Sequence, residues 1–206
     1  MILHRERMRA MLVSAADRME QQSAELSDID SRFGDGDHGV SIAKIARTMR
    51  EEAVNWGEIG FHDFLERLGG RIMAVGAGSA GPLYGTMIGG LAGPLGHEET
   101  IDAGLLQRML QESLVAMCDV TTARAGDKTM MDALIPAVSE GLAASGDVRD
   151  ILCAAAKGAR EGAESSRMFI AKFGRAKNYK EQTIGTPDAG ALSTALLFEG
   201  LAEGCA

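Results

Sequence analysis

The 206-residue chain carries 21 basic and 29 acidic side chains, a formal net charge of −8. Hydrophobic residues make up 46% and charged residues 24%, which is typical of a globular protein with a buried core and not of a disordered or membrane-embedded one. The negative charge argues against general binding of nucleic acid or anionic membranes, so a phosphate ligand would need metal ions or local dipoles.

Apolar residues recur three or four positions apart along most of the chain, which predicts amphipathic helices. The pattern runs through residues 8–19, 40–49, 61–72, 105–114, 134–142 and 191–196. Alternating strand patterns, and Asn-Gly or Asp-Gly hairpins between β-branched runs, are absent. We therefore expect an all-α fold of seven or eight helices with no substantial sheet.

Glycine-rich stretches separate these helices. They lie at residues 34–39, 76–81, 93–96, 125–127 and 185–190. Short connections favour antiparallel neighbours, so we expect an up-and-down bundle in which alternate loops gather at one end. The chain shows no internal repeat and no long linker, which predicts a single domain over residues 1–206.

Cysteine usage and the N-terminus indicate the compartment. Cys118, Cys153 and Cys205 show neither C-x-x-C pairing nor a histidine at ligand spacing, which favours a reducing environment. The first 20 residues mix charges into their apolar positions, and no stretch approaches the ~18 uninterrupted apolar residues of a membrane span. We expect a cytoplasmic protein with neither a membrane nor a nucleic-acid partner.

The segment DSRFGDGDHGVS, residues 30–41, places Asp30, Asp35 and Asp37 among three glycines. Glycine removes side-chain bulk and permits left-handed backbone angles, so the three carboxylates can converge. Converging carboxylates repel one another unless a cation lies among them. Because their oxygens are hard ligands, the segment predicts a site for Mg²⁺, Mn²⁺ or Ca²⁺.

Two other interpretations fit this segment less well. Calcium in an EF-hand fails on spacing, since counting from Asp35 the sixth position is Val40, where glycine is required, and the twelfth is Ala46. Helix capping explains one aspartate but not three. Mg²⁺ is usually held by one or two carboxylates with water and substrate phosphates, and the amides at the next helix start suit phosphate oxygens. We therefore expect a Mg²⁺-nucleotide site.

The segment GAGSAG, residues 76–81, matches the dinucleotide-binding pattern G-x-G-x-x-G. That pattern requires a preceding strand and a βαβ unit, whereas a helical pattern precedes it here. The loop could still offer Ser79 and backbone amides to a phosphate, or it could simply allow tight helix packing. A P-loop motif is absent.

In GDKTMMDALIP, Thr129 and Asp132 have the spacing of a capping box. This structural role leaves Asp127 and Lys128 unexplained.

Two more residues are candidates for phosphate contacts. Arg175 belongs to a basic cluster in an acidic chain, and its guanidinium matches phosphate oxygens, although a solvated basic loop is an equal alternative. His38 follows the third aspartate and either contacts a phosphate or serves as a structural hydrogen-bonding group.

Five motifs, in this order, are similar to those of one known family. They are D-x-x-x-x-D-x-D-H-G at residues 30–39, GPLYGT at 81–86, GDKTM at 126–130, GRA at 174–176, and IG followed by DAGA at 188–191. Together they resemble the nucleotide-binding L subunit of dihydroxyacetone kinase, DhaL, which also forms the C-terminal domain of single-chain ATP-dependent kinases. The resemblance covers almost the whole chain.

The resemblance implies an antiparallel barrel of about eight helices that binds ADP or ATP at one end. It implies two Mg²⁺ ions held by Asp30, Asp35 and Asp37, and no catalytic residue separate from the metal-nucleotide site. The nucleotide contacts that it implies are His38, Gly39, Val40, Ser41, Ser79, Ala80, Thr121, Met130, Arg175, Asp188, Ala189 and Gly190. Thr121, Ala80 and Ala189 stand where relatives carry glycine, serine and proline, which could mark a branch acting on another ketose such as erythrulose.

The function implied is that of the phosphoryl-transferring subunit of a kinase for dihydroxyacetone or a similar small ketose. In such systems a separate K-type subunit holds the ketose, and the L subunit delivers the γ-phosphoryl group. The phosphoryl donor is either free ATP or an M-type phosphocarrier of the phosphotransferase system that recharges a resident ADP. The alternative is a noncatalytic nucleotide-sensing module that regulates a partner protein.

Overall fold

The computed structural model describes residues 1–206 as α-helices and two 3₁₀ segments, with a single isolated β-bridge between Leu3 and Ile101. The elements are α1 (Arg5–Gln21), α2 (Ser23–Ser31), α3 (His38–Val54), α4 (Phe61–Ala74), α5 (Ala80–Gly90), α6 (Ala103–Val120), α7 (Met131–Ala143), α8 (Val148–Ser165), η1 (Ser166–Met168), η2 (Ala176–Thr183) and α9 (Ala189–Gly204). The all-α prediction is therefore confirmed.

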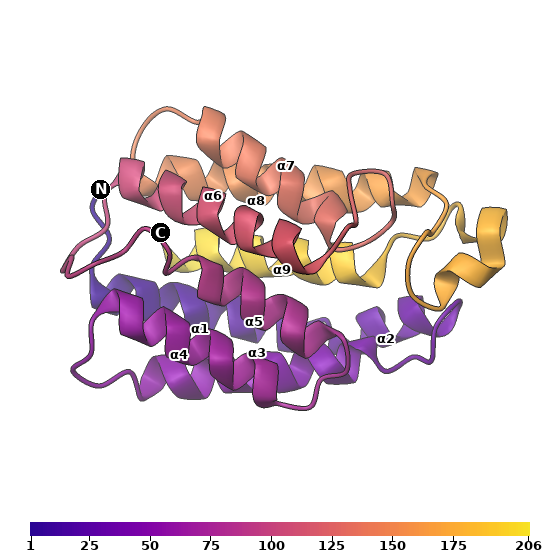
Figure 1. The fold of residues 1–206 in the computed structure, drawn as a ribbon, viewed down its shortest axis with the longest axis horizontal. Helices are drawn as coiled ribbons and strands as arrows, with labels where there is room; N and C mark the ends of the chain where they lie inside the picture. Colours follow the sequence, from indigo (N-terminus) through magenta and orange to yellow (C-terminus); the bar gives the residue numbers. More distant parts are fainter.

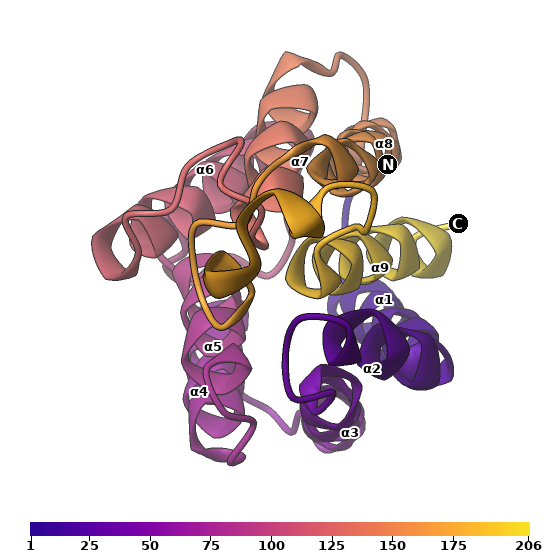
Figure 2. The same ribbon diagram turned by 90° about the vertical axis from the view of Figure 1, so that its right-hand side faces the viewer.

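Eight of these helices form the barrel. In ring order they are α1, α3, α4, α5, α6, α7, α8 and α9, and α9 closes the ring by packing against α1. Figure 2 shows this ring end-on, and Figure 1 shows the helices side by side along the long axis. The short α2 is an additional element that packs on α3. The periodicity did not predict the break at Gln22 that separates α2 from α1.

The core is one contiguous cluster of 55 buried hydrophobic residues. Aromatic packing is confined to a few places, of which the largest joins the end of α3 to α4. There Trp56 stacks on Phe64 with 3.6 Å between ring centroids, and Phe61 contacts the same indole edge-on. Elsewhere small side chains let neighbouring helices approach closely, which explains how so few aromatic residues fill the barrel.

The contact between α1 and α9 shows how close these approaches are. A Cβ added at Gly200 would overlap the backbone of α1 at Ala15. Beside this contact Glu199 accepts hydrogen bonds from Arg18 of α1 and Arg160 of α8, with ion-pair distances of 2.6 Å to each guanidinium. Glycine packing and one shared carboxylate therefore close the ring on both sides of α9.

One end of the barrel collects the loops that carry the sequence motifs. Residues 32–37, 75–79, 121–130 and 166–188 all lie at the end on the right of Figure 1, which we call the site end, whereas both termini lie at the other. The predicted gathering of alternate loops is thus found. Every helix is too short or too polar to cross a lipid bilayer.

Replacing Gly200 by alanine tests the close packing of α9 on α1. Because the new Cβ overlaps backbone that cannot rotate away, we expect Gly200→Ala to lower the free energy of unfolding by about 1–3 kcal/mol. The matched control is Gly70→Ala in α4, where nothing lies within 4 Å of the added atom. That change should be neutral or stabilise by up to about 1 kcal/mol. Urea unfolding measures both, and equal effects would contradict the close approach.

Candidate functional site

A cavity of about 430 Å³ opens at the site end of the barrel. Its lining comes from segments far apart in the sequence, within residues 29–41, 77–84, 128–130, 173–176 and 186–190. This volume lies within the range of sites for small molecules and cofactors. The barrel therefore brings residues of all five motifs that carry the family resemblance to one cavity.

The three aspartates of the 30–41 segment converge at this cavity. Asp30 lies near the end of α2, Asp35 in the following loop, and Asp37 directly before α3. One carboxylate oxygen from each lies within 4.8 Å of the others. The amide of Gly36, whose φ is +76°, donates a hydrogen bond of 2.8 Å to Oδ2 of Asp30 and so orients that carboxylate. A side chain at Gly34 would overlap Asp30, which explains why this turn needs glycine.

The donor set of this cluster fits a hard divalent cation. Helix capping does not explain it, because Asp37 occupies the N-cap position of α3 but its side chain makes no capping hydrogen bond. A carboxylate at that position that leaves the helix amides unbonded is free to coordinate a cation.

Arg175 pairs with one of these carboxylates. Its guanidinium forms an ion pair with Oδ2 of Asp35, although 65% of the arginine side chain is exposed. Partial desolvation acts in the opposite direction, but the ion pair with Arg175 keeps the pKa of Asp35 below its usual value. Arg175 therefore occupies the position of a counter-ion at the cluster, on a side chain with room to move.

His38 is held by a hydrogen-bond network inside the barrel. Its Nε2 lies 2.9 Å from Oγ of Ser193 in α9, and the hydroxyl of the buried Tyr84 in α5 donates to the same oxygen at 2.8 Å. Burial lowers the pKa of His38, so the ring is neutral at neutral pH. Of the residues in this network, the motif comparison gave a nucleotide contact only to His38, although Tyr84 lies within the GPLYGT motif. The polar pair Ser193 and Thr194 within the apolar run of α9 was the available signal for its partners.

Asp188 forms the N-cap of α9 on the opposite wall of the cavity. Its carboxylate accepts a hydrogen bond of 2.8 Å from the amide of Ala191, and its own amide donates to Oγ of Ser166 at 2.8 Å. Burial raises the pKa of Asp188 to about 7, and the charge of Asp132 adds to this effect while Lys128 opposes it. The pKa of Asp188 therefore lies near neutral pH.

The GDKTM loop is ordered by its own side chains. Asp132 accepts hydrogen bonds from the amides of Gly126 (2.6 Å) and Thr129 (2.7 Å), so the T-x-x-D spacing stabilises the turn that enters α7. Asp127 pairs with Lys172 at 2.6 Å. Lys128 is only 5% exposed and donates hydrogen bonds to two backbone carbonyls.

Most of the residues implied by the resemblance line the cavity. Those that do are Asp30, Asp35, Asp37, His38, Ser41, Ser79, Ala80, Met130, Arg175, Asp188, Ala189 and Gly190. Gly39, Val40 and Thr121 do not line it.

The surroundings of these three residues explain why they do not line the cavity. Gly39 packs against the backbone of α2 at Ser23, where a Cβ would overlap. Val40 is 57% exposed. Thr121 ends α6, and its Oγ1 accepts a hydrogen bond of 3.2 Å from the amide of Ala123.

The apolar walls of the cavity were not predicted from the motifs. They include Ile29, Phe33, Phe173 and Pro187. The GAGSAG segment follows helix α4 instead of a strand, so a dinucleotide-binding βαβ unit is excluded as the sequence predicts.

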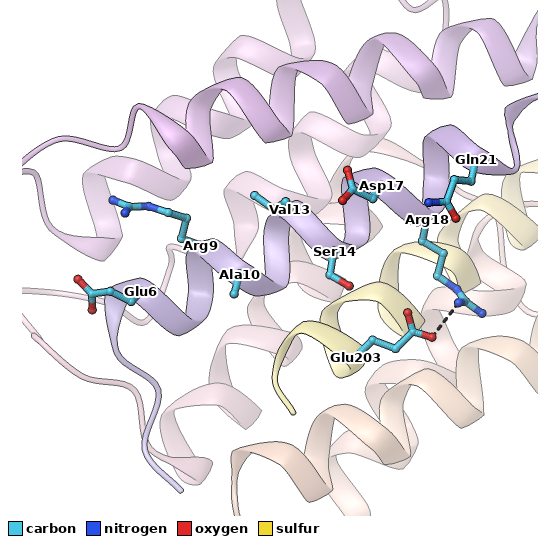
Figure 3. A pocket seen from close by; sticks show the side chains of 9 residues that line it. All are labelled: Glu6, Arg9, Ala10, Val13, Ser14, Asp17, Arg18, Gln21 and Glu203. Atoms are coloured by element: carbon cyan, nitrogen blue, oxygen red, sulfur yellow. Dashed lines mark hydrogen bonds and ion pairs between the residues drawn. The ribbon is translucent and has the colours of Figure 1, made fainter.

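A second hollow of about 510 Å³ lies along the outer face of α1 (Figure 3). Its nine lining residues all come from α1 except Glu203, which forms an ion pair of 2.7 Å with Arg18. Basic and acidic side chains alternate there and no three metal-ligating groups converge. The cavity at the site end is therefore the candidate site.

The raised pKa of Asp188 predicts a pH dependence of stability. Since the folded protein keeps a proton that the unfolded chain has lost between about pH 4 and pH 7, the contribution of this group to stability falls as the pH rises through that window. Asp188→Asn retains a capping oxygen but cannot titrate. We expect the free energy of unfolding of the wild type, relative to this variant, to decline across the window in denaturant titrations.

The control for this prediction is Asp147→Asn at the N-cap of α8. Hydrogen bonding to the N-terminal ammonium lowers the pKa of Asp147, so its titration lies below the window and its difference from wild type should stay constant there. A constant difference for Asp188→Asn as well would contradict the raised pKa.

Comparison with known proteins supports one family. The model of the DAK2 domain matches residues 32–203. The chain is 29% identical over 187 residues to the ADP-binding subunit DhaL of PEP-dependent dihydroxyacetone kinase 1 from Listeria innocua, covering 91% of this chain and 90% of that one. It is 28% identical over 197 residues to the L-erythrulose kinase of Pectobacterium atrosepticum, covering 93% of this chain but only a third (33%) of the relative.

A solved structure agrees with this assignment. The dihydroxyacetone kinase from C. freundii, in complex with AMP-PNP and Mg²⁺, superposes with a TM-score of 0.70 and 25% identity over 95% of this chain and 33% of that one. The match confirms the helical fold and the resemblance stated from the motifs. The chain belongs to the DAK2 domain family, which includes the DhaL subunits of dihydroxyacetone kinases.

Proposed function

We propose that the chain binds ADP or ATP with Mg²⁺ in the cavity at the site end, as the phosphoryl-transferring part of a kinase for a small ketose. The observation that carries the proposal is the convergence of Asp30, Asp35 and Asp37 at the rim of a cavity large enough for a small-molecule ligand. Relatives named as an ADP-binding subunit and a structure solved with AMP-PNP and Mg²⁺ support it.

The three aspartates would hold the metal, with two Mg²⁺ ions as the proposed number. Bound Mg²⁺ offsets the negative charge of the polyphosphate and stabilises charge that develops during phosphoryl transfer. Asp30, Asp35 and Asp37 act as ligands in this assignment and not as general bases. This arrangement also explains how a chain with a net charge of −8 binds a polyanion.

Arg175 and the start of α3 would contact the phosphates. Arg175 leaves Asp35 when a cation takes its place, and its planar guanidinium then matches phosphate oxygens. The backbone amides of His38, Gly39 and Val40 lie in the first turn of α3, where no helical acceptor precedes them. The positive end of the helix dipole favours an anion at this place. Gly39 and Val40 thus contribute through their backbone amides in this proposal, although neither residue lines the cavity.

The remaining contacts are assigned to the other walls. Ser79 and Ala80, at the start of α5, lie beside the phosphate side of the cavity in this proposal, and Met130 with residues 188–190 holds the rest of the nucleotide. Thr121 has no part in it, because it lies at the C-cap of α6 outside the cavity, where its hydroxyl accepts a hydrogen bond from the amide of Ala123.

A partner protein would hold the ketose. The chain spans about a third (33%) of the L-erythrulose kinase that it matches, whereas its length corresponds to that of the separate DhaL subunit from Listeria innocua. As the resemblance implies, we propose a K-type partner that binds the ketose. The phosphoryl donor is ATP or an M-type phosphocarrier, as the resemblance implies.

Asp35→Asn tests the metal-nucleotide site. Loss of one carboxylate ligand should weaken ADP binding in the presence of Mg²⁺ by at least about tenfold, equivalent to about 1.4 kcal/mol. Isothermal titration calorimetry with and without Mg²⁺ measures this change. Asp28→Asn is the matched control, because Asp28 is an exposed aspartate of α2 that pairs only with Arg32 and lies outside the cluster. Metal-independent binding of ADP that survives Asp35→Asn would disprove the assignment.

A reconstituted assay tests the kinase role. With ATP, Mg²⁺ and a K-type partner loaded with dihydroxyacetone or erythrulose, we expect phosphoryl transfer that requires this chain. Nucleotide-dependent binding to the partner without turnover would instead favour the sensing module.

A further inference from the structure

We propose that Lys128 is a positioning residue that holds residues 186–190, one wall of the cavity, in the conformation that binds the nucleotide. The inference rests on the proposed function, since it concerns the same cavity. The motif comparison assigns no role to this lysine.

One ammonium group joins three segments of the chain. Nζ of Lys128 donates hydrogen bonds to the carbonyl oxygens of Ser166 (2.6 Å) and Thr186 (2.5 Å), which lie 38 and 58 residues further along the sequence. Ser166 is the C-cap of α8, where the negative end of the helix dipole favours a cation. Thr186 begins the 186–190 wall. The lysine thus ties that wall to the end of a barrel helix.

Ser166 is the second point at which the wall is held. Its hydroxyl accepts a hydrogen bond from the amide of Asp188 (2.8 Å) and donates to the carbonyl of Ala163 (2.6 Å). Ser166 therefore accepts hydrogen bonds from both residues, from Lys128 at its carbonyl oxygen and from the amide of Asp188 at its hydroxyl oxygen. The position of the α9 N-terminus, and of Ala189 and Gly190 after Asp188, depends on this shared anchor.

Two features of Lys128 are energetically unfavourable, its backbone conformation and the burial of its charge. Its φ is +61°, a left-handed conformation that residues with side chains rarely adopt. Its ammonium is buried, and no carboxylate lies within ion-pair distance. Burial therefore lowers the pKa of Lys128. The charges of Asp188 and Asp132 partly oppose this shift, and the charge of Arg167 adds to it. Such costs persist where the surrounding structure requires one particular geometry.

A purely structural role would have different consequences. If Lys128 only stabilised the fold, its loss would loosen the barrel as a whole. Apart from bonds within α9, few others hold the wall. The amides of Gly185 and Thr186 donate to the carbonyls of Arg167 and Thr183 at 2.7 and 3.4 Å, and Nη1 of Arg167 donates to the carbonyl of Gly185 at 3.4 Å. Loss of a positioning residue should therefore loosen residues 183–190 and leave the aspartate loop and the helix core unchanged.

Lys128→Met tests the proposal, because methionine has a similar length but can neither donate nor carry charge. We expect the Kd for ADP in the presence of Mg²⁺, measured by titration calorimetry, to rise at least about tenfold. Hydrogen exchange of the amides in residues 183–190 should accelerate, with exchange in α3 and α7 unchanged. Lys172→Met is the control, since Lys172 is exposed and forms an ion pair with Asp127, the residue before Lys128, and neither Lys172 nor Asp127 lines the cavity. It should leave both readouts near the wild-type values.

Several outcomes would overturn the proposal. Wild-type affinity for ADP in Lys128→Met would do so, as would exchange that accelerates throughout the barrel. If Lys128→Met does not fold, Lys128→Gln takes its place under the same criteria, and failure of both to fold would assign the lysine a structural role. Failure of the wild-type chain to bind ADP would instead contradict the proposed function, which is a separate result.

Discussion

Mutual repulsion of three carboxylates is the constraint on which the site end depends. Asp30, Asp35 and Asp37 present oxygens within 4.8 Å of one another, an arrangement that needs positive charge nearby. The neighbourhood supplies it from the amide of Gly36, the guanidinium of Arg175 and the N-terminus of α3. These groups allow the chain to fold with the three carboxylates already close together, as the proposed metal site requires.

The barrel makes this arrangement possible by fixing loops that are distant in sequence. Close glycine contacts and the shared carboxylate of Glu199 set the spacing of α9 against α1 and α8. The start of α9, which carries Asp188, is thereby placed opposite the aspartate loop. Hydrogen bonds that join Ser193 to His38 and to Tyr84 then connect α3, α5 and α9 within the barrel, so that both walls of the cavity belong to one hydrogen-bonded framework.

Local patterns predicted the parts of this molecule that depend on neighbouring residues. Helical periodicity and glycine-rich breaks predicted the helices and the loops, and the spacing of three aspartates among glycines predicted a cluster that the structure brings together. Long-range contacts were beyond such patterns. His38 contacts Ser193, which lies 155 residues further along the chain. The sequence offered no explanation for Lys128, whose hydrogen bond to Ser166 is visible only in the structure. The extra helix α2 was missed because its break at Gln22 involves neither glycine nor proline.

Anomalous diffraction from crystals grown with Mn²⁺ and ADP tests the central claim most directly, since manganese replaces magnesium at hard oxygen sites and scatters anomalously. The account predicts density for at least one ion among the carboxylates of Asp30, Asp35 and Asp37, with Arg175 turned away from Asp35 and the diphosphate next to the ion. Three carboxylates directed apart into solvent, or manganese bound only elsewhere, would contradict it.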